Sequence, residues 1–295
     1  PCVHSASGLL SSSISRGTMS FASLSANEKQ DLEGSDMEPV KKLSRSIKGK
    51  VALVTGAASG MGRATAHLFA DEGAKVAVID LSQERVDAVV NEITEAGGTA
   101  EGWALDVADG EGIVRVVKEV EQHFGGLDIL VNNAGLATFH GIGEPGYEDT
   151  WARALDVMLT AHMRFVRAAL PSLKKSGEGR IVNIASTEGF GATPGNSPYV
   201  AAKHGVIGLT RALAVELGRE GVTVNCICPG PIRTGITQEI PDEHKEIFAK
   251  RRVPLRRYGD PEEVAHVTLS VVLPASSYLT GVAIPVDGGM LVKNA

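Results

Sequence analysis

The sequence predicts an α/β fold with one doubly wound parallel sheet of about seven strands flanked by helices. Apolar residues make up 43% of the chain but aromatic residues only 4%, so the core must consist mainly of Val, Ile, Leu and Ala. Parallel strands covered on both faces by helices have this composition. Short apolar runs also alternate with segments of helical periodicity, which is typical of this fold class.

The regular pattern begins near Lys50. An apolar run at 51–55 leads into a glycine-rich turn at 56–62, a helical stretch at 63–72 and a second apolar run at 75–80. Strand, turn, helix and strand follow one another within about thirty residues, which predicts one βαβ unit.

The alternation continues towards the C-terminus. Two further segments each place four aliphatic residues on one helical face, namely Val86, Val89, Val90 and Ile93, and then Ile113, Val116, Val117 and Val120. Each of these helices precedes another apolar run. Later strands are predicted at 128–131, 180–185, 222–228 and 282–286, which gives seven strands with intervening helices.

Residues 1–48 differ from the rest. They are rich in Ser, lack apolar periodicity, and place an acidic patch at 28–38 before a basic one at 41–48. We interpret them as an N-terminal extension, flexible or draped over the body and in part non-native, and residues 49–295 as a single domain. The first 27 residues contain no Asp or Glu, so an organelle transit peptide is an alternative interpretation.

Composition argues against several partners. The formal charge of -6 provides no basic field for nucleic acid, and no apolar run is long enough to span a membrane. Three cysteines form no disulfide framework, which favours a reducing, cytoplasmic location. We take Cys226 and Cys228 to point to opposite faces of the strand 222–228, and therefore predict small core residues there and no metal site.

The glycine-rich turn predicts a phosphate-binding site. Gly56, Gly60 and Gly62 follow a strand and open a helix, so bare backbone can approach a pyrophosphate and the helix N-terminus can face it. A helix-packing turn without a ligand is the alternative. The βαβ context favours dinucleotide binding.

Asp80 predicts which dinucleotide binds. It ends the second strand, where an acid contacts the ribose hydroxyls of the adenosine half. Its carboxylate would repel a 2′-phosphate, and neither Ser59 nor Leu81 supplies a cation, so NAD is preferred over NADP. A helix N-cap is the alternative role for Asp80.

The candidate reaction centre is Ser186, Tyr199 and Lys203. Spacing of i and i+4 places Tyr199 and Lys203 on one helical face, where an ammonium group favours the phenolate and lowers the tyrosine pKa towards the working range. Ser186 ends an apolar run and adds a hydroxyl. The same spacing also occurs as a solvated pair on surface helices.

Residues 49–290 resemble the short-chain dehydrogenase/reductase family, whose fold is of the Rossmann type. The resemblance is carried by several motifs in order: Thr55 to Gly62, Asp106-Val107, Asn132-Asn133-Ala134-Gly135, Ser186, Tyr199 with Lys203, Pro229-Gly230 with Thr234, and Asp287-Gly288-Gly289. It implies an NAD-dependent interconversion of a secondary alcohol and a ketone. The implied cofactor-binding residues are Gly56, Ser59, Gly60, Met61, Gly62, Asp80, Leu81, Asp106, Val107, Asn133, Ala134, Gly135, Tyr199, Lys203, Pro229, Gly230, Ile232 and Thr234.

The resemblance also implies a mechanism. Ser186 positions the substrate oxygen, Tyr199 exchanges its proton, and Lys203 lowers the tyrosine pKa while it binds the nicotinamide ribose. Many relatives carry an Asn 28 residues before the serine that holds a relay water near the lysine, but here the residue is Met158. Three interpretations of Met158 compete. Water or a backbone carbonyl sustains the relay, which the intact Ser186, Tyr199 and Lys203 favour. Alternatively, the proton step is slower, or the protein is a catalytically weak NAD-binding regulatory or interaction protein.

The substrate side is less specific. Glu188, Phe190 and Thr193 lie between Ser186 and Tyr199 and are candidate contacts with a small-molecule alcohol or ketone, and residues 235–258 occupy the position of a mobile lid. A surface helix is the plainer interpretation of that charged segment. By analogy with relatives, we expect a homotetramer or a dimer.

Overall fold

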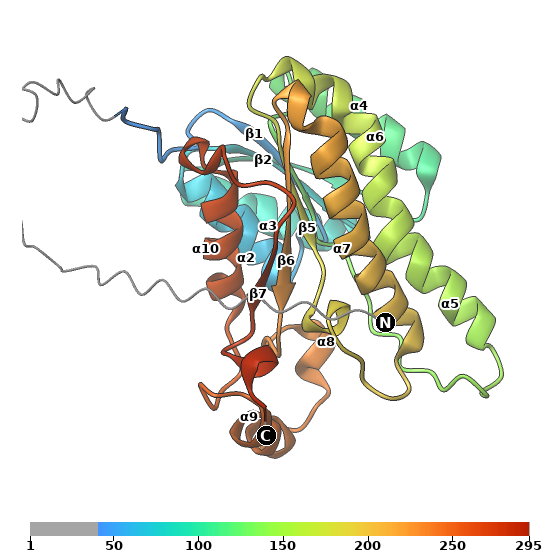
Figure 1. The fold of residues 1–295 in the computed structure, drawn as a ribbon. Helices are drawn as coiled ribbons and strands as arrows, with labels where there is room; N and C mark the ends of the chain where they lie inside the picture. Colours follow the sequence, from blue (N-terminus) through green and yellow to red (C-terminus); the bar gives the residue numbers. More distant parts are fainter. Residues whose placement is uncertain (1–40, 295) are drawn as a thin grey trace, which may run out of the picture. The chain divides into compact units, whose positions relative to one another are not determined.

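The structure is a computed structural model that describes residues 41–294, and in it seven strands form one sheet in which every neighbouring pair is parallel. The predicted fold class is confirmed (Figure 1). Residues 1–40, most of the proposed extension, lie outside the described part. The order is β3-β2-β1-β4-β5-β6-β7, with strands β1 Val51–Thr55, β2 Lys75–Asp80, β3 Thr99–Ala104, β4 Ile129–Asn132, β5 Arg180–Ile184, β6 Thr223–Pro229 and β7 Ala283–Val286.

The strand order reverses direction at β1, which pairs with β2 on one side and with β4 on the other. The chain therefore winds outward in two directions from the middle of the sheet. Between β1 and β4 the connecting segments leave on opposite faces, which opens a crevice at the carboxyl ends of these strands.

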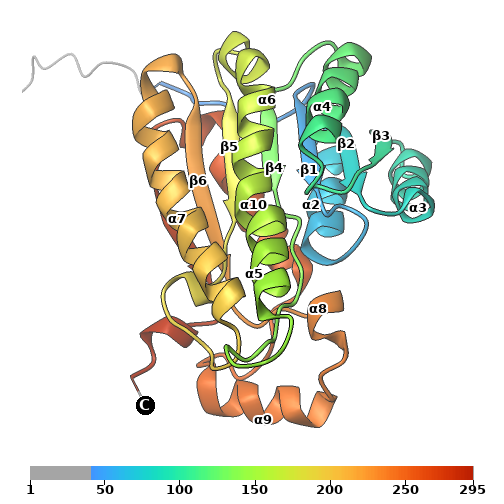
Figure 2. The ribbon, with the colours of Figure 1, turned by 90° about the vertical axis from the view of Figure 1, so that its right-hand side faces the viewer.

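Helices cover both faces of the sheet (Figure 2). Helices α2, α3 and α10 bury their apolar sides with one face, and α4, α6 and α7 with the other. Phe69 of α2 and Phe165 of α6 are the largest fully buried side chains, one in each layer. The bounds are α2 Gly60–Asp71, α3 Gln83–Glu95, α4 Gly110–Phe124, α5 Tyr147–Leu155, α6 Ala161–Lys175, α7 Ser197–Leu217, α8 Gly235–Gln238, α9 Asp242–Arg252 and α10 Pro261–Val272.

A π-helical turn, Asp156–Thr160, joins α5 to α6 without interrupting the helical path. It contains Met158, whose side chain is fully buried in the layer between α6, α7 and the sheet. Single π turns inside longer helices are frequent at functional sites, because the extra residue changes which side chains face the interior.

The expectation for the two strand cysteines is wrong. Side chains alternate along a strand, so residues two apart lie on the same face. In β6 the Sγ atoms of Cys226 and Cys228 are 3.8 Å apart and both residues are buried. They pack with Ala185, Val206 and Ile207 beneath α7, so their expected role as small core residues remains compatible with the structure.

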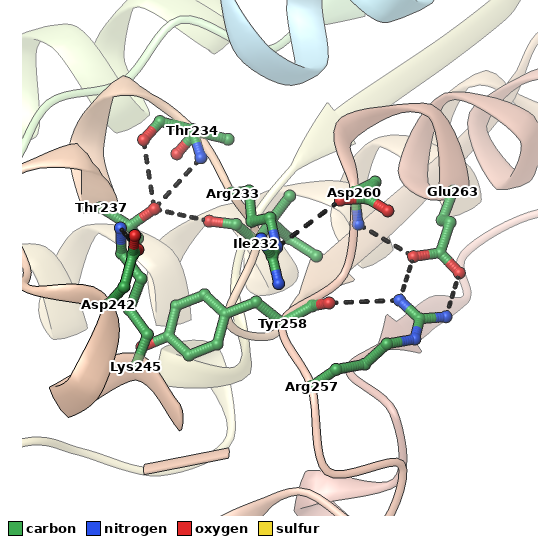
Figure 3. A network of polar contacts seen from close by, with 10 residues as sticks. All are labelled: Ile232, Arg233, Thr234, Thr237, Asp242, Lys245, Arg257, Tyr258, Asp260 and Glu263. Carbon is green, nitrogen blue, oxygen red and sulfur yellow. Dashed lines mark hydrogen bonds and ion pairs between the residues drawn. The ribbon is translucent and has the colours of Figure 1, made fainter. Parts of the chain in front are cut away.

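The segment proposed as a lid contains α8 and α9, which lie beyond the carboxyl ends of the strands (Figures 1 and 2). Polar contacts fix both of its ends (Figure 3). The Thr237 hydroxyl donates to the Ile232 carbonyl at 2.8 Å. At the other end, Arg257 forms two hydrogen bonds of 2.6 and 2.7 Å with Glu263. The intervening helices are thus held at two points.

No helix within residues 41–294 combines the length and the apolar character that crossing a bilayer requires.

Candidate active site

The glycine-rich turn joins β1 directly to α2. Gly56 and Gly60 have φ angles of 64° and 52°, in the left-handed region that favours glycine. A Cβ at Gly62 would collide with the Gly56 carbonyl oxygen and lie 2.5 Å from the Asn133 amide nitrogen. Glycine at this position lets α2 begin close against β1, with its N-terminal N–H groups towards the crevice.

Thr55 ties this turn to the segment that follows β4. Its hydroxyl oxygen accepts from the backbone N–H groups of Asn133 at 2.9 Å and Ala134 at 3.0 Å. The Asn133 amide in turn donates to the Thr55 carbonyl at 2.8 Å. One threonine and one asparagine therefore fix two loops of the crevice relative to each other.

Asp80 is held at the end of β2 by backbone donors. One carboxylate oxygen accepts from the Ala58 N–H at 2.9 Å and the other from the Leu81 N–H at 2.7 Å. The N-cap of α3 is Ser82, whose hydroxyl accepts from the Arg85 N–H. The helix-capping alternative for Asp80 is therefore wrong, because another residue performs that role.

Asp106 lies across the crevice from the glycine-rich turn and carries a negative charge. Burial opposes ionisation, but the Ala108 N–H and the Arg153 guanidinium outweigh it and hold the pKa of Asp106 below its ordinary value. The N–H bond is 2.9 Å long, and the nearest guanidinium nitrogen lies 3.1 Å from a carboxylate oxygen. The carboxylate is thus fixed at the rim.

These segments enclose a cleft of about 320 Å³, called the central cleft below. Most of the predicted cofactor residues line it: Gly56, Ser59, Gly60, Met61, Asp80, Leu81, Asp106, Val107, Asn133, Ala134, Gly135, Tyr199, Lys203 and Thr234. The sequence analysis missed other lining residues, namely Arg85, Leu105, Leu136, Arg153, Val157, Ile184, Ala185, Gly235 and Ile236. The only signal in the sequence for these residues was adjacency, since several of them directly precede or follow a residue that was predicted.

Four predicted cofactor residues do not line the central cleft. Gly62 supports the turn from behind, and Gly230 packs so closely on Asp287 that an added Cβ would lie 2.7 Å from its Cα. Pro229 ends β6, and the Ile232 side chain is buried in the core.

Tyr199 and Lys203 enter the same cleft from the first turns of α7. Lys203 is 3% exposed, its Nζ donates to the Ile184 carbonyl at 2.8 Å, and it lies 5.4 Å from the centroid of the Tyr199 ring. Ser186, 8% exposed, follows β5, and its hydroxyl accepts from the Glu188 N–H at 3.1 Å. An ammonium and a phenol thus line the cleft, and the Ser186 hydroxyl lies beside the phenol, although Ser186 itself is not among the lining residues.

The pKa of Tyr199 does not follow the expectation. Burial raises it above its ordinary value, the Ser186 hydroxyl acts in the opposite direction, and the Glu188 charge adds to the increase. Burial also lowers the pKa of Lys203 to about 8. In the protein by itself, desolvation therefore favours the neutral forms of both groups, because neither charge is hydrated.

Met158 borders the lysine end of the cleft. A Cβ at Gly135 would lie 3.8 Å from the Met158 sulfur and 4.0 Å from the Lys203 nitrogen, so both groups approach the same small glycine. A thioether is a weak acceptor and donates nothing. The methionine supplies none of the polar contacts of an asparagine amide there.

The candidate substrate residues form a loop beside Ser186. The Glu188 carboxylate accepts from the Thr193 N–H at 2.8 Å and from its hydroxyl at 2.7 Å. These two residues therefore close the loop upon itself. Phe190 is 44% exposed and is the member that presents apolar surface.

Comparison with known proteins decides the family. The model of the enoyl-(acyl carrier protein) reductase family matches residues 56–291. The chain belongs to the short-chain dehydrogenase/reductase family. Membership makes it an oxidoreductase and accounts for the glycine-rich turn and the Tyr-x-x-x-Lys helix in one cleft.

Several characterised members of the short-chain dehydrogenase/reductase family are similar over nearly their whole length. The 3-oxoacyl-(acyl-carrier-protein) reductase FabG of Thermotoga maritima is 41% identical over 246 residues, covering 83% of this chain and 99% of the relative. The 2,5-dichloro-2,5-cyclohexadiene-1,4-diol dehydrogenase LinX of Sphingobium indicum is 40% identical over 250 residues, covering 85% and 99%.

Among solved structures, one described as a candidate NAD(P)-dependent gluconate 5-dehydrogenase from Beutenbergia cavernae, with NADP bound at low occupancy, superposes with a TM-score of 0.80. It is 37% identical, and the match covers 85% of this chain and all of the other.

Proposed function

We propose that this oxidoreductase interconverts a secondary alcohol and a ketone with NAD, and that Tyr199 is the acid/base. The observation that supports this most is the common cleft: Tyr199 and Lys203 line the same cavity as Gly60 and Asp80. A dinucleotide with its pyrophosphate at α2 and its adenosine ribose at Asp80 would place its nicotinamide towards Tyr199.

Each side chain has a role that follows from its position. Ser186 orients the substrate oxygen, and Tyr199 takes the hydroxyl proton during oxidation or returns it during reduction. Lys203, anchored on the Ile184 carbonyl, holds the nicotinamide ribose and passes the proton onward. When bound, NAD supplies the hydride acceptor and a positively charged ring, which favours the tyrosinate that burial alone disfavours.

The preference for NAD rests on Asp80. Its two oxygens are fixed by backbone N–H groups, so the negative charge cannot easily move away from an approaching 2′-phosphate. Arg85 follows Asp80 by five residues and lines the same cleft, as do Arg153 and Lys203. Arg153 pairs with Asp106 and Lys203 lies over the Tyr199 ring, so Arg85 is the candidate cation for the adenosine ribose. Because a solved relative holds NADP, the competing candidate is an NADP enzyme in which Arg85 binds the phosphate.

Binding titrations decide between the two cofactors. We expect NAD to bind more tightly than NADP. Asp80→Ala should reduce or reverse this difference in affinity, because it removes the repulsion between the carboxylate and the 2′-phosphate of NADP. In the wild-type protein, a preference for NADP that Arg85→Ala abolishes would overturn the assignment of Asp80.

Turnover tests the reaction itself. A panel of hydroxyacyl thioesters, sugar acids and cyclic diols, the classes named by the relatives, is offered with NAD, and formation of reduced nicotinamide is followed by absorbance. We expect turnover of at least one class, abolished in Tyr199→Phe while NAD still binds. Tight NAD binding without turnover on any member would favour the catalytically weak regulatory or interaction protein that Met158 suggests.

We also propose self-association into a homotetramer or a dimer through α5, α6 and α7. Val215 on α7 is 86% exposed and Trp151 on α5 is 38% exposed, so apolar surface is available on these helices. Light scattering coupled to size exclusion tests the proposal, and a monomer at micromolar concentration would contradict it.

A further inference from the structure

His162 is a buried imidazole without a hydrogen-bond partner among the described residues. It is 2% exposed, and both of its ring nitrogens lack a partner. A neutral imidazole has one donor and one acceptor to satisfy, and each unmet group costs about 1–3 kcal/mol. An apolar residue would fill the same space without this cost, so the histidine requires an explanation.

Three buried polar side chains form a row that runs from α7 across β5 to β4. Thr210, Asn183 and Asn132 are joined by hydrogen bonds of 3.0 Å from the Asn183 amide to the Thr210 hydroxyl and 2.9 Å from the Asn132 amide to the Asn183 carbonyl oxygen. The remaining oxygen, Asn132 Oδ1, is buried and has no partner within residues 41–294. The row therefore ends in an unused acceptor.

The row and His162 belong to the same layer. Alternation along β4 and β5 directs Asn132 and Asn183 to the face that packs with α6, since Leu130 and Ile181, two residues earlier in each strand, lie in that layer. Helix α6 contacts both strands. An unmet donor at His162 and an unmet acceptor at Asn132 thus lie in the same layer, without a direct hydrogen bond between them.

On its other side His162 adjoins the lysine end of the cleft. It follows Met158 by four residues, about one helical turn, and the Met158 sulfur and Lys203 nitrogen approach the same Cβ position at Gly135. Burial and the Lys203 charge lower the pKa of His162 to about 3. The imidazole is therefore neutral at working pH and retains one nitrogen that accepts a hydrogen bond. Of the three Lys203 protons, one is donated to a described residue, the Ile184 carbonyl.

We propose that His162 is a positioning residue that links Lys203, through water molecules, to the polar row ending at Asn132, and so replaces the amide that Met158 lacks. One water accepts a hydrogen bond from a ring N–H and donates to Asn132 Oδ1, and a second accepts a hydrogen bond from the Lys203 ammonium and donates to the other ring nitrogen. Each water then has polar partners on two sides, as a buried water requires. The role of this relay in turnover rests on the proposed function, whereas the hydrogen bonds of His162 do not.

The first test is a kinetic rescue. His162→Leu removes both ring nitrogens. We expect kcat to fall by about tenfold or more, which is a modest part of the rate enhancement that a positioned proton-transfer group supplies. The affinity for NAD should stay within about twofold of that of the wild type. Adding Met158→Asn to that variant restores an amide beside Lys203, and we expect it to recover most of the lost kcat. A purely structural histidine would not be rescued in this way. His162→Gln, which keeps a donor and an acceptor, is the second variant if the leucine variant does not fold.

The second test needs no turnover. Nitrogen NMR of the ¹⁵N-histidine-labelled protein is expected to show His162 neutral between pH 5 and 9, in a single tautomer with one protonated and one hydrogen-bonded nitrogen. Lys203→Met should change the chemical shift of the hydrogen-bond-accepting ring nitrogen and leave that of the protonated nitrogen unchanged. Titration of His162 near pH 6.5, a mixture of tautomers, or an active wild-type enzyme whose kcat is unchanged by His162→Leu would each overturn the proposal. If no substrate is turned over while the NMR result holds, the failure lies with the proposed function and the hydrogen-bonded position of His162 stands.

Discussion

Burial of neutral His162 makes a quantitative prediction for stability in acid. Its pKa is lowered from 6.5 to about 3 in the native protein, so below pH 6.5 the unfolded chain binds a proton that the native state refuses. The contribution of this residue to stability is fully present above pH 6.5 and is lost as the pH falls towards 3. At pH 5.0 the loss is about (6.5 − 5.0) × 1.36, or roughly 2 kcal/mol, and His162→Leu abolishes it.

Urea unfolding followed by circular dichroism measures this difference, provided that unfolding is reversible and two-state. The free energy of unfolding of wild type and His162→Leu is compared at pH 7.5 and pH 5.0. We expect the wild type to lose about 2 kcal/mol more than the variant between these values. His204→Gln, which removes an exposed histidine from α7, is the matched control. Equal losses in wild type and His162→Leu would refute the reasoning, because the imidazole would then be protonated in the native state.

Three further predictions concern the rest of the cleft. Met158→Asn in the wild-type background should raise the alcohol-oxidation rate or leave it unchanged in steady-state assays, and a large loss would contradict the view that the methionine merely weakens a standard relay. Gly62→Ala should weaken NAD binding at least tenfold in a calorimetric titration, since its Cβ would displace the Gly56 carbonyl, and overpacking of this kind costs about 1–3 kcal/mol. Thr55→Val should lower the free energy of unfolding by about 1–3 kcal/mol, because the backbone N–H groups of Asn133 and Ala134 lose their acceptor. An unchanged denaturation midpoint would show that water replaces the hydroxyl.

The sequence was sufficient to predict the sheet and most of the cleft, because both depend on local patterns. Apolar runs, helical periodicity and glycine positions are properties of short segments. Asp80 was found because it ends a predicted strand, and Tyr199 because a spacing of four residues places it on the same helical face as Lys203; both line the cleft. The other predicted residues that line the cleft, such as Asp106, Asn133 and Thr234, came from the resemblance to the short-chain dehydrogenase/reductase family.

The parts that failed depend on burial or on packing between elements. The direction of the Tyr199 pKa shift follows from desolvation, which no spacing reveals. The unpartnered nitrogens of His162 become visible only when α6 packs on the sheet. The error at Cys226 and Cys228 is of another kind, since the two-residue repeat of a strand already places both side chains on one face.

The π-helical turn Asp156–Thr160 sets the rotational phase between the two halves of a long helix. In an α-helix each residue advances by about 100°, so removing one residue from this turn would rotate every following side chain of α6 by that angle. Phe165 would leave the core, and His162 would turn away from the layer it shares with Lys203. The length of this short turn, more than the identity of its residues, therefore determines which side chains of α6 face the interior. Insertions and deletions here would be far less tolerated than substitutions.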